Sequence, residues 1–201
     1  MITDTASGST KDRLVTEGLR LFAAQGFRAT TVGEIEAAAG LQPRRGALYR
    51  HFASKDELLS EAVRRHVEAV REGRDWMLTL PAGDVRTEAL ILGRFVLDEL
   101  ARERQIVDVF EHEGSRLAEL RDLFRERISD TSYQAMTDLL RRWTGGSGDA
   151  DLDAYGVLVL GALVNVHRST WTFGGPPRGL EQDRMLAAWA DLCVDIVRRA
   201  S

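Results

Sequence analysis

Apolar side chains recur at intervals of three and four residues along most of this chain, and the strict alternation typical of β-strands is nearly absent. The first ten residues are polar and predict an irregular tail. A first helix is expected from Lys11 to Gln25, because Gly26 stands where a left-handed residue would end it. Thr31 and Glu34 form a capping-box pattern, which predicts a second, short helix ending near Gly40.

The rest of the chain continues as predicted helices separated by clusters of Gly and Pro. Pro43 suits the first position of a third short helix. A second capping-box pattern, from Ser54 to Glu57, predicts the start of a long fourth helix. Further helices are expected at about 84–108, 115–143, 152–172 and 180–200. We therefore expect an all-α protein with about nine helices.

Three short helices within about forty residues, with a tight turn between the second and third, are typical of a helix-turn-helix DNA reader. The third helix of such a module enters the major groove, so one of its faces must be exposed. Leu48 and Phe52 lie four residues apart and predict the face that packs on the core. Arg45 and Tyr49 share a neighbouring stripe, which leaves them available to DNA.

Charge is distributed unevenly, in a way that suits contact with DNA at one end of the chain. The formal net charge is −4 overall. Residues 11–55 nevertheless hold eight Lys and Arg against four Asp and Glu, a net charge of +4, so the remainder is acidic. Thr31 and Lys55 stand at the starts of two predicted helices, where free backbone N–H groups bind phosphate. Both are therefore expected to clamp the DNA backbone.

Composition places the chain among ordinary globular proteins, with 44% hydrophobic and 29% charged residues. Its single cysteine, Cys193, excludes a disulfide within the chain, and neither a signal segment nor a membrane-spanning run is evident. We therefore expect a cytoplasmic protein without membrane attachment. Adjacent residues such as Glu111-His112-Glu113 do not face one site on a helix, so no metal is predicted. Nor do we find a catalytic motif, so neither an enzyme nor a cofactor is expected.

The N-terminal residues resemble the DNA-binding domain of the TetR family of transcriptional regulators. The resemblance covers about residues 11–60 and rests most on Gly46-Ala-Leu-Tyr-Arg-His-Phe52 and Ser54-Lys-Asp-Glu-Leu58. It implies that the third helix reads the major groove. It implies phosphate contacts for Thr31, Tyr49, His51 and Lys55, and positions at or near base edges for Arg45, Gly46, Ala47 and Arg50, with Arg44 expected beside them.

One feature departs from the commonest pattern of that family. Seven residues separate Gly40 from Leu48, where five are usual. Two extra residues would rotate a helix by about 200°, so we expect the turn or the first helical turn to absorb them. Several residues also have a plainer interpretation: Tyr49 and Phe52 as core aromatics, and His51 as a surface histidine. Gly46 inside a helix would cost about 1 kcal/mol relative to Ala, which favours close approach of its backbone to DNA.

Beyond the helix-turn-helix segment, the resemblance implies a larger helical domain with a ligand cavity and a dimer interface made by its last two helices. We divide the chain into a tail at 1–10, a helix-turn-helix domain at 11–56, and a ligand-binding and dimerisation domain at 57–201. The apolar run 155–164 needs cover on all sides, which favours a homodimer over an internal core. The expected interface residues are Leu158, Ala162, Met185, Trp189, Leu192 and Ile196. The candidate ligand contacts are Trp76, Phe95, Phe110, Tyr133, Trp143, His167 and Trp171, each of which is also typical of a helical core.

The leading hypothesis is a repressor that leaves its operator when a small, largely apolar ligand binds. Its expected partners are double-stranded operator DNA, a second copy of the chain, and that ligand. Two other classes stay open: a helical enzyme or small-molecule carrier with a basic N-terminal bundle, and a protein-binding adaptor that no longer reads DNA. DNA binding separates the first class from the other two.

Overall fold

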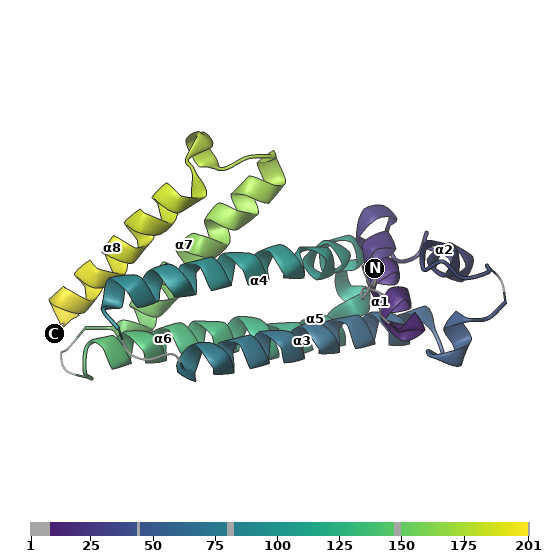
Figure 1. Ribbon diagram of the computed structural model, residues 1–201, viewed down its shortest axis with the longest axis horizontal. Helices are drawn as coiled ribbons and strands as arrows, with labels where there is room; N and C mark the ends of the chain where they lie inside the picture. The colour runs from purple at the N-terminus through teal and green to yellow at the C-terminus, as the bar shows by residue number, and fades with distance from the viewer. Residues whose placement is uncertain (1–8, 44, 80–82, 147–149, 201) are drawn as a thin grey trace, which may run out of the picture. The chain divides into compact units, whose positions relative to one another are not determined.

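The computed structural model describes residues 9–43, 45–79, 83–146 and 150–200, and every regular element within them is a helix (Figure 1). The α-helices are α1 (Thr10–Gln25), α2 (Val32–Ala38), α3 (Lys55–Thr79), α4 (Val85–Glu113), α5 (Ala118–Phe124), α6 (Thr131–Trp143), α7 (Leu152–Phe173) and α8 (Gln182–Ala200). Three 3₁₀ segments are η1 (Leu48–Arg50), η2 (Gly114–Leu117) and η4 (Pro177–Gly179), and η3 (Arg125–Asp130) is a π-helical turn. The expected all-α class is confirmed.

The expected count of about nine helices is wrong. In the part of the chain that the structure describes there are eight α-helices, and only six of them have more than ten residues. The third short helix predicted from Pro43 is a turn that leads into the three-residue η1. The helix predicted at 115–143 is interrupted, because its first residues belong to the 3₁₀ segment η2 and the π-helical turn η3 separates α5 from α6.

Helix starts agree with the predictions where a side chain caps them. The Thr31 hydroxyl accepts a hydrogen bond from the Glu34 N–H, and the Glu34 carboxylate accepts one from the Thr31 N–H, so this capping box is complete. The Ser54 hydroxyl accepts from the Glu57 N–H at 3.1 Å, while the Glu57 carboxylate accepts from the Ala53 N–H instead. The sequence therefore specifies α2 and α3 locally.

The helices form two compact units, and α3 and α4 contribute to both of them. Unit 1 comprises residues 1–69 and 103–124, and includes the whole segment 11–56. Its core contains Phe22, Phe27 and Leu48, each at most 2% exposed. Of the predicted tail, residues 1–8 lie outside the described residues, and Ser9 caps α1.

Unit 2 comprises residues 70–102 and 125–201, and its core lies among α4, α6, α7 and α8. The Trp189 indole N–H donates to the Val159 carbonyl at 2.9 Å and so joins α8 to α7, which Figure 1 draws side by side. Cys193 is fully buried in this core, and burial raises the pKa of its thiol to about 12, which indicates a structural side chain. Among the described residues of the whole chain, no helix is both long enough and apolar enough to cross a bilayer.

Candidate functional site

The predicted reading segment is a turn followed by η1, and this turn absorbs the two extra residues. Gly40 and Gly46 both adopt positive φ, +71° and +68°. An L-residue is strained at such angles, so the backbone conformation accounts for Gly46, and the cost of a glycine inside a helix does not apply. Arg45 lies in the turn, ahead of η1. Arg44 lies outside the described residues.

Two buried side chains and one buried carboxylate hold this segment in place. Leu48 and Phe52 are 0% and 3% exposed, as the four-residue spacing predicted. Glu36, on α2, is also fully buried, and its Oε1 accepts a hydrogen bond from the Leu48 N–H at 3.0 Å. A carboxylate is costly to bury unless hydrogen bonds compensate it. We therefore interpret Glu36 as the residue that positions η1 on α2, a role that the sequence pattern did not indicate.

The residues predicted to meet DNA are largely exposed on this scaffold. Tyr49 is 60% exposed, so it is not a core aromatic, and Arg45, Arg50 and His51 are exposed as well. Gly46 and Ala47 are partly buried. The turn and η1 thus present two guanidinium groups, a phenol and an imidazole to solvent over a short stretch.

Thr31 and Lys55 make internal contacts as well as lying at helix starts. The Lys55 ammonium donates to the carbonyls of Phe27 and Thr30, at 2.7 and 2.5 Å, and lies 4.7 Å from the centre of the Phe27 ring. Burial lowers the pKa of Lys55, and the neighbouring Arg116 adds to that effect. Lys55 therefore ties together the loop between α1 and α2, and an ammonium group has three N–H donors, one more than these two bonds use.

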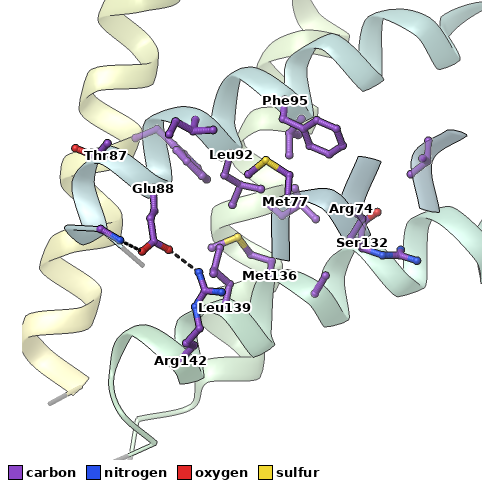
Figure 2. A pocket seen from close by; sticks show the side chains of 17 residues that line it. Arg74, Met77, Thr87, Glu88, Leu92, Phe95, Ser132, Met136, Leu139 and Arg142 are labelled. Atoms are coloured by element: carbon purple, nitrogen blue, oxygen red, sulfur yellow. Dashed lines mark hydrogen bonds and ion pairs between the residues drawn. The ribbon is translucent and has the colours of Figure 1, made fainter. Parts of the chain in front are cut away.

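Unit 2 contains an apolar cavity with a volume of about 150 Å³ (Figure 2). Its walls come mainly from α3, α4 and α6, and include Met77, Leu92, Phe95 and Met136. The Phe95 ring fits against Gly73, where an added Cβ would come within 2.8 Å of it. A concave, mostly apolar cavity with a few polar groups is the usual form of a small-molecule site.

An ion pair closes one end of this cavity. The Glu88 carboxylate accepts hydrogen bonds from the Gly83 N–H at 2.8 Å and from the Arg142 guanidinium at 2.5 Å, and Figure 2 shows the side chains of Glu88 and Arg142 pointing toward one another. The Trp143 indole N–H donates to the same carboxylate at 2.9 Å. Burial alone would raise the pKa of Glu88, but the hydrogen bonds from Trp143, Gly83 and Arg142 outweigh it and lower the pKa. Glu88 therefore stays ionised and neutralises Arg142.

The structure does not bring the seven candidate ligand residues together. Phe95 lines the cavity, and Trp143 contacts it through Glu88. Phe110 belongs to the core of unit 1, where its ring meets Phe124 edge to face. Trp76 is 57% exposed, Tyr133 packs against the core of unit 2, and His167 and Trp171 contact each other on α7. Among the described residues, no group of three or more His, Cys, Asp or Glu side chains is arranged to hold a metal ion.

The six residues expected at a dimer interface also fall into different environments. Trp189 and Ile196 are 4% and 5% exposed and belong to the core of unit 2, which is the internal alternative for the apolar helices. Leu158 and Leu192 are 67% and 47% exposed, Ala162 is exposed, and Met185 is partly buried. The exposed members leave apolar surface on both α7 and α8.

Comparisons with known proteins point to one family. The family model described as bacterial regulatory proteins, tetR family, matches residues 14–62. The repressor KstR2 of Mycolicibacterium smegmatis is 29% identical over 158 residues, which cover 76% of this chain and 75% of that protein. The regulator TcmR of Streptomyces glaucescens is 36% identical over 91 residues, which cover 42% of this chain and only 38% of TcmR.

Solved structures share the fold over nearly the whole chain. A TetR-family regulator from Mesorhizobium loti superposes with a TM-score of 0.67 at 17% identity, covering 98% of both chains. At this identity the likeness concerns the fold, including the helices beyond the segment that the family model matches.

Proposed function

The chain belongs to the TetR family of transcriptional regulators, and from this premise we propose that it is a repressor which binds operator DNA as a homodimer and is released by a small ligand in unit 2. The observation that carries the proposal is the exposed basic segment from Arg45 to His51, held by the buried Leu48, Phe52 and Glu36. The name of the relative KstR2, a transcriptional repressor, supports repression over activation.

Release by a ligand requires that the ligand favour one arrangement of the protein over another. The cavity in unit 2 gives the ligand a place to bind, and α3 and α4 contribute to both units. A ligand that changes how these helices pack in unit 2 can therefore affect unit 1 along the same helices. We propose that α3, which begins three residues after Phe52, transmits most of this change from unit 2 to unit 1.

The proposal is tested by titrating the full chain into labelled DNA from the region that flanks its own gene. We expect tight binding that weakens as salt increases and a much weaker affinity for random DNA. Equal, weak binding to both sequences would instead favour the carrier or the adaptor, neither of which reads DNA.

The two arginines of the reading segment are predicted to behave differently. The resemblance implies a base-edge position for Arg45, but Arg45 lies in the turn before η1, so we propose instead that it contacts phosphate. Arg45→Ala should therefore weaken binding to operator and to random DNA by the same factor. Arg50 lies within η1, so Arg50→Ala should relax the preference at one or two operator positions, worth about 1–3 kcal/mol of discrimination. Competition titrations against operator variants measure both effects. A change of sequence preference in Arg45→Ala would show that it reads a base.

Lys55→Ala is predicted to lower both stability and DNA affinity. The variant loses two hydrogen bonds from a charged donor, so the free energy of unfolding should fall by about 1–3 kcal/mol. If the remaining N–H contacts a phosphate, the slope of log affinity against log salt concentration should also decrease in size by about one. Lys11→Ala is the matched control, because the Lys11 ammonium pairs with Glu61 and lies 5.5 Å from the centre of the Phe52 ring, but donates to no backbone carbonyl of the described residues. An unchanged unfolding free energy for Lys55→Ala would contradict the stabilising role.

A further inference from the structure

Two arginine side chains line the cavity in unit 2, and they differ in whether a carboxylate pairs with them. Arg142 pairs with Glu88, as described above. Arg74, at the opposite end in Figure 2, donates from Nη1 to the Thr131 hydroxyl at 2.8 Å, a neutral acceptor. Within the described residues no carboxylate pairs with Arg74; the adjacent Asp75 pairs with Arg71 at 2.7 Å. Among the described residues that line the apolar cavity, Arg74 is therefore a cationic side chain without a carboxylate partner.

The position of Arg74 is fixed by an irregular part of the chain. The Thr131 hydroxyl that accepts from Arg74 lies within hydrogen-bond distance of the Arg127 and Ile128 carbonyls, at 2.7 and 3.1 Å. Both carbonyls belong to the π-helical turn η3, and such turns are frequent at functional sites. Thr131 can therefore donate to η3 and still accept from Arg74, which leaves most of the five guanidinium N–H donors available.

A second donor lies beside Arg74. Ser132 follows Thr131 on α6 and lines the same cavity, and Figure 2 draws its side chain close to that of Arg74. Its hydroxyl makes no hydrogen bond to another described residue. A planar guanidinium can bind both oxygens of a carboxylate, and the hydroxyl adds a further donor at the same end.

The size of the cavity limits the apolar part of the ligand. A cavity of about 150 Å³ with apolar walls is large enough for a benzene ring. Met77 and Met136 have flexible, polarisable side chains that suit contact with an aromatic ring, and Phe95 provides an aromatic surface. The apolar walls and the cationic end together favour a compact ring that carries one negative charge.

We propose that the ligand of this cavity is a small aromatic carboxylate, with its ring between Phe95 and the two methionines and its carboxylate on Arg74 and Ser132. This inference rests on the proposed function for the role of unit 2 as the effector domain. The assignment of the ligand class, however, can be tested by binding alone, without DNA.

The test compares phenylacetate with 2-phenylethanol, a neutral analogue of similar size, by calorimetric titration of the full chain. Phenylacetate should bind at least about tenfold more tightly, because a charge-assisted contact is lost in the alcohol. Arg74→Met should reduce the affinity for phenylacetate by about tenfold or more and leave that for the alcohol within about twofold. Arg74→Lys should fall between these values, since it keeps the charge but not the planar fork.

Arg64→Met serves as the matched control, since Arg64 lies on the same helix α3, is exposed, does not line the cavity, and pairs with Glu61, away from Arg74. It should leave both affinities unchanged. If Arg74→Met fails to fold, Ser132→Ala tests the same end of the cavity. This variant should lower the affinity for phenylacetate and leave the affinity for 2-phenylethanol unchanged. Equal affinities for the two compounds, no binding of either, or an unaltered phenylacetate affinity in both Arg74→Met and Ser132→Ala would each overturn the proposal.

A separate titration of operator DNA, with and without saturating phenylacetate, distinguishes this inference from the proposed function. Binding of phenylacetate through Arg74 without any change in operator affinity would support the ligand class and refute release. Loss of operator affinity on adding phenylacetate in the wild-type chain, but not in Arg74→Met, would support both.

Discussion

Replacing Leu158 by glutamate is expected to convert the proposed homodimer into monomers of 22.4 kDa. Leu158 is 67% exposed on α7, and Val157 beside it is 53% exposed. The substitution therefore leaves the folded monomer intact but would place an unpaired charge inside the dimer interface, which is costly. A helix-turn-helix dimer binds two half-sites, so a monomer should lose on the order of a hundredfold or more in operator affinity. Sedimentation velocity at micromolar concentration and a DNA titration measure the two effects.

The matched control for this variant is Gln105→Glu, which adds the same charge at an exposed position of α4, outside α7 and α8. It should remain dimeric and bind operator normally. A Leu158→Glu chain that still sediments at twice the monomer mass would move the interface away from this face. A wild-type chain that is monomeric and yet binds operator tightly would refute the homodimer itself.

The parts of the fold that follow from local rules could be predicted from the sequence. The Thr31–Glu34 capping box, the start of α3 at Ser54 and the burial of Leu48 and Phe52 depend on residues within four positions of one another. Gly26, which ends α1 at φ +87°, belongs to the same group. The basic segment and its exposed side chains also followed from the pattern, because η1 keeps Leu48 and Phe52 inward even without a regular helix.

The parts that depend on packing between distant segments could not be predicted. Glu36 is one acidic residue in a short helix, and only the approach of Leu48 from twelve residues away makes it a buried hydrogen-bond acceptor. Lys55 similarly reaches carbonyls 25 and 28 residues distant. The cavity shows the same limit: Arg74 comes from α3 and Thr131 from α6, and no sequence period relates them. Aromatic content alone pointed to Phe110, which the fold uses in the core of unit 1.

Glu36→Ala is expected to cause the largest loss of DNA binding among substitutions that touch no DNA. It removes the acceptor of the Leu48 N–H, and a buried N–H left without a partner costs about 1–3 kcal/mol. Because Leu48 begins η1, the exposed side chains of Tyr49, Arg50 and His51 lose their fixed position along with it. We expect operator affinity to fall by more than the loss of stability alone explains, as measured by urea unfolding and by DNA titration at a temperature where the variant is folded.

Glu34→Ala is the matched control for this last prediction. Glu34 is the same residue type two positions earlier on α2, but it is exposed and its carboxylate caps the helix through Thr31. Both variants remove one negative charge from a basic domain, which by itself should strengthen binding to DNA. Glu34→Ala should therefore weaken α2 without displacing η1, and its operator affinity should exceed that of Glu36→Ala clearly. If the two variants lose operator affinity equally, the effect comes from α2 as a whole, and Glu36 does not position the reading segment.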